Sequence, residues 1–167
     1  IGLGSGSAAG RGAWVDVAAA ALQRLGARGV LDLGAGDHPG PRLPSSILPV
    51  RDLAHAWLFP RMAALVHHGG AGTTGAGLTA GKPTVVIPTS SDQPFWGRRV
   101  HALGVGPAPI PIRRLTEEAL TRALATVLSD RGVRARALEL GKQLRAEDGV
   151  GAAVDRIVSF LGSQPIT

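Results

Sequence analysis

Hydrophobic positions along this chain alternate between short, nearly continuous apolar runs and longer stretches with helical spacing. The apolar runs predict buried strands at the start of the chain and at residues 29–36, 47–50, 63–68 and 83–88. The amphipathic stretches predict helices at residues 13–26, 53–62, 73–81, 94–104, from Thr116 onward, 133–146 and 150–161. Strands that alternate with helices across short loops are typical of a parallel, doubly wound, Rossmann-like α/β sheet.

Glycine-rich turns follow several of the predicted strands. The carboxyl ends of parallel strands share one edge of the sheet, and ligands of such folds bind at that edge. The run at 83–88 is apolar throughout, which places its strand in the sheet interior. The piece at 105–111 has too many prolines for a central strand.

Composition narrows the class of protein. A length of 167 residues suits one domain, and with 44% hydrophobic and 18% charged residues the chain is globular rather than disordered. Cysteine is absent, which excludes disulfides, thiolate metal sites and cysteine nucleophiles. No apolar run reaches the ~20 residues of a membrane span, and a cytoplasmic location is the default expectation. The sole methionine is Met62 and the chain opens on Ile1, so we expect a processed product or a fragment.

The net charge of +6 raises the question of nucleic-acid binding. Lys82 and Lys142 are the only lysines, the arginines are scattered, tyrosine is absent and 4% of the residues are aromatic. The stacking platforms of single-strand binders are therefore missing, and we expect no nucleic-acid partner. The charge still permits a weak peripheral attraction to acidic membrane surfaces.

The segment 66–88, VHHGGAGTTGAGLTAGKPTVVIP, admits more than one nucleotide-binding interpretation. Gly70, Gly72 and Gly75 spell G-x-G-x-x-G after a predicted strand, and Asp92 follows about twenty residues later, as in a dinucleotide fingerprint. That fingerprint belongs to the first strand–helix unit of its fold, whereas here it follows the fourth strand. An NAD-binding domain is therefore a minor alternative.

Two further motifs match known nucleotide sites only in part. Residues 30–40, VLDLGAGDHPG, resemble the nucleoside-binding loop of S-adenosylmethionine methyltransferases, with Asp32 in the acidic position. Prolines follow where that family has a helix, so a methyltransferase is a second minor alternative. The sequence GKPT resembles part of a P-loop, but Pro83 stands at the hydroxyl position and removes both the hydroxyl and a backbone donor, which excludes that interpretation.

The segments HHGGAGTT, AGKPTVVIP and DQPFWGRRVHALGVGPAPIP together closely resemble the C-terminal, donor-binding half of GT-B glycosyltransferases. The resemblance is nearest to sterol 3-β-glucosyltransferases and to bacterial antibiotic (macrolide and glycopeptide) glycosyltransferases that transfer a sugar from UDP or TDP. It covers nearly the whole chain, from GLGS near the start to RAEDGVGAAVDRI near the end. It implies that residues 1–167 form one nucleotide-sugar-binding domain, without the N-terminal acceptor-binding domain of the family.

Residue chemistry agrees with a diphosphate at the turn after the fourth strand. Gly70 and Gly72 leave room for backbone N–H groups to approach phosphate oxygens, and a helix entered at Thr73 and Thr74 directs its positive end there. His68 is placed to donate to a phosphate oxygen, and the resemblance implies the same role. The predicted donor-binding residues are Ser5, His68, Gly70, Ala71, Gly72, Thr73, Thr74, Asp92 and Gln93.

Asp92 and Gln93 open the turn after the fifth strand, where carboxylate and amide groups suit sugar hydroxyls. In the family the matching pair holds the donor hexose; an alternative makes Asp92 the N-cap of the next helix. Ser5 matches the family's Gly-Ser turn near the diphosphate, although an ordinary turn serine explains it equally well. His67 and Trp57 are expected to pack in the core, and base stacking by Trp57 is the weaker alternative.

The resemblance implies an inverting transfer, in which an acceptor hydroxyl, activated by a general base, displaces the nucleotide at the anomeric carbon. The base and the acceptor pocket belong to the N-terminal domain in the family, so no catalytic base is assigned here. We expect UDP-glucose as donor, a lipophilic hydroxyl compound such as a sterol or polyketide as acceptor, and neither metal nor cofactor. A stand-alone nucleotide-sugar-binding module without turnover is the alternative from another functional class.

Overall fold

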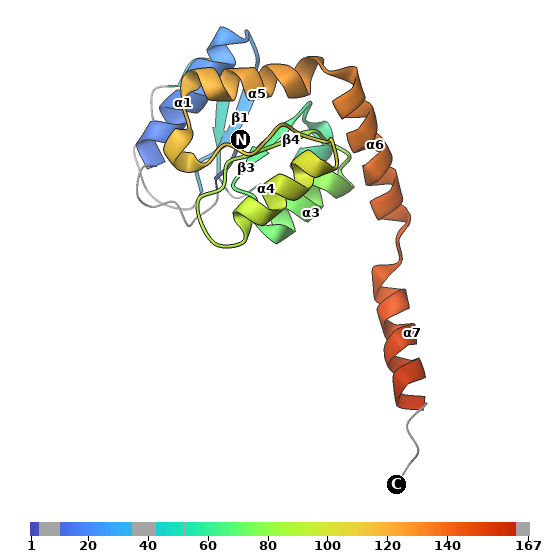
Figure 1. Cartoon of the computed structure of the whole chain (residues 1–167). Helices are drawn as coiled ribbons and strands as arrows, with labels where there is room; N and C mark the ends of the chain where they lie inside the picture. The colour runs from blue at the N-terminus through green and yellow to red at the C-terminus, as the bar shows by residue number, and fades with distance from the viewer. Residues whose placement is uncertain (4–10, 35–42, 52, 163–167) are drawn as a thin grey trace.

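Short parallel strands form the sheet of this protein (Figure 1). The computed structural model describes residues 1–3, 11–34, 43–51 and 53–162. The strands are β1 (Gly29–Asp32), β2 (Ile47–Val50), β3 (Leu65–His67) and β4 (Thr84–Val86). β1 pairs in parallel with β2, and β3 with β4. Gly2 bridges both Asp32 and His67, so the start of the chain lies between the two pairs. The resulting order, β2–β1–Gly2–β3–β4, confirms the predicted doubly wound parallel sheet.

Helices cover both faces of this sheet, and the core divides accordingly. The helices of the described part are α1 (Arg11–Arg24), α2 (His55–Leu58), α3 (Ala71–Thr79), α4 (Gln93–Ala102), α5 (Glu117–Ser129), α6 (Arg131–Ala146) and α7 (Gly149–Gly162), with short 3-10 turns at Phe59–Arg61 and Ile112–Arg114. Val85 and Ile87 pack with apolar residues of α1 and α5. Val86 packs with apolar residues of α3, α4 and α6. This alternation along one strand explains why Val85, Val86 and Ile87 are all apolar.

Helix ends follow the capping chemistry of the sequence. The Thr116 hydroxyl accepts the Ala119 N–H at 3.2 Å, as the sequence predicts for the start of α5. α6 begins at Arg131, two residues earlier than the periodicity predicts. The reason is Asp130, whose carboxylate accepts the N–H groups of Gly132 and Val133 at 2.7 and 3.1 Å.

The proline-rich segment 105–111 lies along the outer side of β4. The Thr84 N–H donates to the Val105 carbonyl, and the Ile110 N–H donates to the Val86 carbonyl, both at 3.0 Å. These hydrogen bonds place the segment at the edge of the sheet, where prolines are tolerated. The prediction that it is not a central strand is confirmed.

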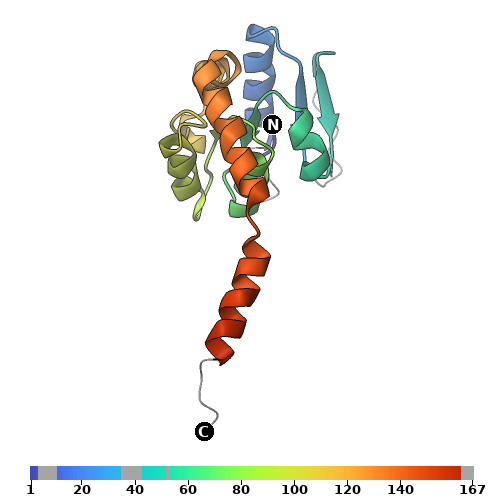
Figure 2. The ribbon, with the colours of Figure 1, turned by 90° about the vertical axis from the view of Figure 1, so that its right-hand side faces the viewer.

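α7 extends away from the rest of the molecule, as both views show (Figures 1 and 2). Its apolar side chains are exposed: Val150, Val154, Ile157, Val158, Phe160 and Leu161. In the described part of the chain, no helix combines the length and apolar character that crossing a membrane requires.

Candidate functional site

The turn after β3 leads directly into α3 and leaves backbone donors at the carboxyl edge of the sheet. Gly70 is the N-cap, and the first intrahelical bond runs from the Thr74 N–H to the Gly70 carbonyl at 2.9 Å. The N–H groups of Ala71, Gly72 and Thr73 precede that bond, so the helix gives them no acceptor. Three donors at the positive end of a helix suit an anion such as a phosphate.

Glycine is required or useful at two positions of this turn for different reasons. A Cβ on Gly70 would lie 2.6 Å from Nε2 of His68, so the absence of a side chain lets the imidazole pack against the turn. A Cβ on Gly72 would meet nothing within 4 Å. The backbone at Gly72 is therefore open to an approaching ligand, as the sequence predicts for this position.

The two threonines of the predicted site lie in different environments. α3 already begins at Ala71, so Thr73 and Thr74 fall within its first turn. Thr73 is half-buried, whereas Thr74 is only 1% exposed and its hydroxyl is enclosed. Thr73 is thus the threonine whose side chain reaches the surface, while Thr74 packs inside the molecule. Ser5, the remaining predicted residue of the phosphate half, lies outside the described residues.

His68 is half-buried beside the first turn of α3. Burial lowers the pKa of its imidazole below the usual 6.5, and the nearby His55 lowers it further, while Asp92 opposes both effects. The ring is therefore neutral at neutral pH in the ligand-free protein. One ring nitrogen of a neutral imidazole donates and the other accepts. Nδ1 of His68 is enclosed without a hydrogen-bond partner among the described residues.

The turn after β4 holds the two polar residues predicted to contact a sugar. Oε1 of Gln93 accepts three hydrogen bonds: from the Thr89 N–H at 2.7 Å, the Thr89 hydroxyl at 2.9 Å and the Ser90 N–H at 3.1 Å. This oxygen is fully occupied, so Gln93 can offer a ligand only its NH₂ donors. One carboxylate oxygen of Asp92, Oδ2, accepts the Trp96 indole N–H at 2.8 Å. The other oxygen of Asp92 makes no such contact with the described residues and can accept from a ligand hydroxyl.

The two turns lie against each other. A Cβ on Gly69 would be 3.1 Å from the Gln93 carbonyl oxygen and 2.6 Å from Cγ1 of Val86. Asp92 acts electrostatically on His68 across the same junction. The structure therefore brings the α3 N-terminus, His68 and the Asp92–Gln93 pair together at one edge of the sheet, although over twenty residues of sequence separate the two turns.

Two sequence-based interpretations are wrong. Asp92 lies at the N-cap position of α4 as predicted, but its side chain accepts none of that helix's backbone N–H groups, so the side-chain capping role fails. Trp57 is 53% exposed rather than buried, with the Arg61 guanidinium 4.4 Å from its ring centroid. Phe59, which is 7% exposed, is the aromatic residue that this segment buries. α2 has only four residues, too short for periodicity to identify its buried face.

Other residues of the second turn are absent from the sequence-based prediction. Trp96 orients Asp92, Thr89 anchors Gln93, and Ser91 adopts a left-handed conformation with φ of 55°. The four-residue spacing of Asp92 and Trp96 in a helix start is the one signal that pointed to their contact, because such residues share a helix face. A left-handed serine carries no signal in its residue type.

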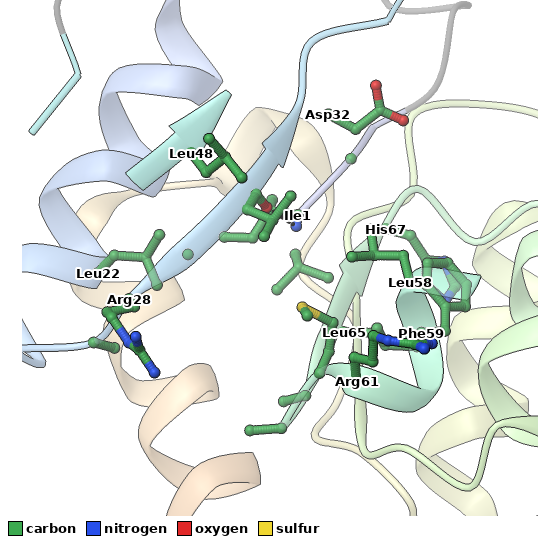
Figure 3. A pocket seen from close by; sticks show the side chains of 18 of the residues that line it. Ile1, Leu22, Arg28, Asp32, Leu48, Leu58, Phe59, Arg61, Leu65 and His67 are labelled. Carbon is green, nitrogen blue, oxygen red and sulfur yellow. Dashed lines mark hydrogen bonds between the residues drawn. The ribbon is translucent and has the colours of Figure 1, made fainter. Parts of the chain in front are cut away.

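A cavity of about 790 Å³ lies against the sheet between β1 and β3 (Figure 3). Arg28 and Ala64, where the two strands begin, line one end, and His68 and Thr73 line the other. Most of its wall is apolar, with Leu22, Leu58, Phe59 and Leu65 among its side chains. Of the candidate site, only His68 and Thr73 line the cavity, and both lie at the end nearest the carboxyl edge, so the volume itself does not mark the site. His, Asp and Glu side chains form no metal-binding cluster within the described residues.

Comparison with known proteins identifies a family and several relatives of this chain. Residues 16–159 match the family model described as "Erythromycin biosynthesis protein CIII-like, C-terminal domain". A sterol 3-beta-glucosyltransferase of Arabidopsis thaliana is 44% identical over 149 residues, which are 89% of this chain and 23% of the relative. The O-mycaminosyltylonolide 6-deoxyallosyltransferase of Streptomyces fradiae is 41% identical over 136 residues, which are 81% of this chain and 31% of the relative. This chain therefore spans only about a quarter to a third of these curated relatives.

A solved structure shares the fold over nearly the whole chain. The glycotransferase of kitacinnamycin superposes with a TM-score of 0.83 at 27% identity, covering 95% of this chain and 42% of that one. The match confirms that the sheet and its helices have the architecture of one half of a GT-B glycosyltransferase.

Proposed function

The chain belongs to the family of erythromycin biosynthesis protein CIII-like C-terminal domains, and on that premise we propose that it is the donor-binding half of an inverting glycosyltransferase. The donor is a UDP-sugar, with UDP-glucose as the one we expect. The acceptor is a hydroxyl of a lipophilic compound such as a sterol or polyketide. The names of the two curated relatives, one a sterol glucosyltransferase and one a deoxyallosyltransferase acting on a tylonolide, support this substrate class.

One observation carries the proposal. The free N–H groups at the start of α3 lie beside a neutral, half-buried His68, and the Asp92–Gln93 pair lies across the same junction. The first group suits a diphosphate, because helix N-termini and an imidazole donor stabilise negative charge. The second suits a sugar, because a free carboxylate oxygen accepts from hydroxyls while an amide NH₂ donates to them. A nucleotide-sugar carries both chemistries in one molecule.

In the proposed reaction, the acceptor oxygen forms a bond to the anomeric carbon while the bond from that carbon to the diphosphate oxygen breaks. The acceptor proton passes to a general base, and the nucleoside diphosphate leaves with the bonding electron pair. The α3 donors and His68 stabilise the charge that develops on the departing diphosphate. The base and the acceptor pocket are assigned to a separate domain. This chain covers 23% of the sterol glucosyltransferase and 42% of the solved glycotransferase, so both relatives are long enough to contain such a domain.

Ligand binding provides the first test. Calorimetry should detect UDP or TDP binding and no binding of NADH or S-adenosylmethionine. His68→Ala should weaken UDP and UDP-glucose alike, by roughly 1.5–3 kcal/mol, if the imidazole donates directly to the diphosphate. His101→Ala is the matched control, since His101 is an exposed histidine of α4 whose Nδ1 lies 3.3 Å from the Gly106 carbonyl oxygen. Tight binding of NADH or S-adenosylmethionine without UDP would overturn the proposal.

Transfer activity separates the half-enzyme from a stand-alone binding module. UDP-glucose and a sterol or polyketide alcohol are supplied to the chain alone and to a fusion with a relative's acceptor domain. Transfer by the fusion only is the expected result, because the reaction site is assembled from both halves. Robust transfer by the chain alone would refute the half-enzyme assignment. UDP-glucose binding without transfer in either format would favour the module.

A further inference from the structure

His67 is a buried polar side chain that the proposed function does not use. It ends β3, one residue before His68, and is only 2% exposed. Nδ1 of its ring accepts the Gly69 N–H at 3.0 Å. Nε2 is enclosed and has no hydrogen-bond partner among the described residues. Buried polar groups normally form hydrogen bonds, and the bond of this imidazole runs to an N–H only two residues away. The role of that hydrogen bond therefore needs an explanation.

The hydrogen bond fixes the chemical state of this ring. Nδ1 can accept only when it carries no proton, so the proton of the neutral ring sits on Nε2. Burial, with smaller contributions from the neighbouring His68 and His55, lowers the pKa of His67 to about 3. The imidazole is therefore neutral, with an acceptor facing Gly69, throughout the physiological range.

Gly69 is the point at which the chain leaves the strand and heads for α3. Its φ of 93° lies in the region that favours glycine. The backbone there has little room to shift, because a Cβ at Gly69 would already lie 2.6 Å from Cγ1 of Val86 and 3.1 Å from the Gln93 carbonyl oxygen. The Gly69 N–H points into this buried turn, where an unpaired donor would be costly. His67 supplies the acceptor and so holds the turn in one orientation.

The orientation of that turn decides where the ligand-facing groups lie. His68 and Gly70 flank Gly69 directly, and the free N–H groups of α3 begin one residue later. A rotation of the Gly69 peptide would move the His68 ring and the helix start together. We propose that His67 is a positioning residue whose Nδ1 acceptor fixes the Gly69 turn and thereby sets the affinity of the α3 N-terminus and His68 for a nucleoside diphosphate. The inference rests on the proposed function for its ligand.

Two amide substitutions separate positioning from mere burial. His67→Asn keeps a carbonyl acceptor at the position of Nδ1, whereas His67→Gln moves the polar group one methylene further and cannot reach the Gly69 N–H. Thr84→Val is the matched control, because it removes another buried side-chain bond, from the Thr84 hydroxyl to the Lys82 carbonyl, at the opposite end of β4. UDP affinity, melting temperature and hydrogen exchange of the Gly69 amide are measured for each variant.

The expected result is a split between these variants. His67→Gln should weaken UDP by about five- to tenfold, the effect of roughly one lost neutral hydrogen bond, and should speed Gly69 amide exchange. His67→Asn should restore both, and Thr84→Val should lower the melting temperature without changing UDP affinity. Equal UDP affinity in His67→Gln and the wild type, or equal loss in both amide variants, would overturn the inference.

The outcome stays interpretable if a variant is unstable or the ligand is wrong. If His67→Gln does not fold, the comparison passes to His67→Asn, which must bind UDP within about threefold of the wild type for the inference to stand. If the wild type itself binds no UDP, the proposed function fails. In that case hydrogen exchange of the Gly69 amide still tests the positioning contact. The exchange should be slow in the wild type and in His67→Asn, and fast in folded His67→Gln.

Discussion

The two turns that form the candidate site are built by opposite means. The first, from His67 to Thr73, consists of glycines, a buried histidine and the open start of a helix. The second, from Thr89 to Trp96, is more exposed and is held by side chains, chiefly the Gln93 oxygen and the Asp92–Trp96 contact. The first offers backbone donors to a ligand, and the second offers side-chain atoms.

This difference matches the two halves of the proposed ligand. A diphosphate is common to UDP- and TDP-sugars, so a turn of backbone donors that only a substitution to proline would remove suits it. The sugar varies among donors, and side-chain contacts can change with single substitutions. Substitutions in the first turn should therefore lower stability and the affinity for every nucleotide, whereas substitutions in the second turn should lower only the affinity for the sugar.

Gly69→Ala should have the largest effect on the molecule. A methyl group at this position would lie 2.6 Å from Val86 Cγ1 and would require a positive φ. Left-handed strain and overpacking together predict a loss of roughly 2–5 kcal/mol in the free energy of unfolding. Urea unfolding measures this loss. Gly72→Ala is the control, since a Cβ there meets nothing within 4 Å; it should keep or slightly raise stability while weakening UDP. An unchanged urea midpoint in Gly69→Ala would contradict a rigid first turn.

Acid should destabilise the first turn through His67. Its folded-state pKa of about 3 lies below the 6.5 of an unfolded histidine. Both states are neutral above pH 6.5, but below it the unfolded chain gains a proton that the folded state accepts only near pH 3. Stability therefore falls as the pH drops through this window, by about 1.4 kcal/mol per pH unit at most, or about 2 kcal/mol between pH 7 and pH 5.

The variant His67→Asn isolates this contribution, because it cannot take up the proton. The difference in unfolding free energy between pH 7 and pH 5, measured by urea titration, should be smaller in the variant than in the wild type. An identical pH dependence would mean that His67 is protonated in the folded state well above pH 3.

Sequence reasoning predicted the first turn better than the second. Glycine spacing after an apolar run has a direct backbone meaning, so the open helix start at Gly70–Thr73 and the buried His67 agree with it. The doubly wound parallel sheet also followed, because alternation of strands and helices permits few topologies. Thr74 marks the limit of this reasoning: one helical position separates a surface threonine from a buried one.

The second turn depended on contacts that residue type does not encode. Asp92 was identified as polar and well placed, but whether it would cap a helix backbone or bind an indole is decided by the side-chain geometry. Gln93 likewise has two polar atoms, and only the fold shows which one Thr89 and Ser90 occupy. The exposure of Trp57 was missed because a four-residue helix lacks a measurable period.

Asp92→Asn should affect the sugar and spare the nucleotide. The amide oxygen can still accept from Trp96, so the turn persists, but the charged acceptor for a sugar hydroxyl is lost. UDP-glucose affinity should fall by about 1–2 kcal/mol while UDP affinity stays unchanged. Calorimetry with both ligands measures the split. Trp96→Phe, which frees Asp92 from its indole contact, should show the same selectivity to a smaller degree. Equal weakening of UDP and UDP-glucose by Asp92→Asn would show that the second turn also serves the diphosphate.

Ser91→Gly should have the smallest effect and tests how firmly side chains hold the second turn. Ser91 has φ of 55°, which costs a non-glycine residue about 1 kcal/mol. Glycine removes this strain but adds about 0.4–1 kcal/mol of unfolded-chain entropy, so the net change in stability is close to zero. The freer backbone should lower UDP-glucose affinity by less than about threefold and leave UDP affinity unchanged.

Ser91→Ala is the control for this variant, because it keeps the Cβ and the strain while removing the hydroxyl, and it should bind both ligands as the wild type does. The three bonds to Gln93 Oε1 come from Thr89 and Ser90, so they persist in both variants. These hydrogen bonds join the residues before Ser91 to Gln93, which follows it. The change in backbone freedom at residue 91 should therefore remain local. A large loss of UDP-glucose binding in Ser91→Gly would mean that the left-handed residue, rather than the hydrogen-bond network, sets the position of Asp92.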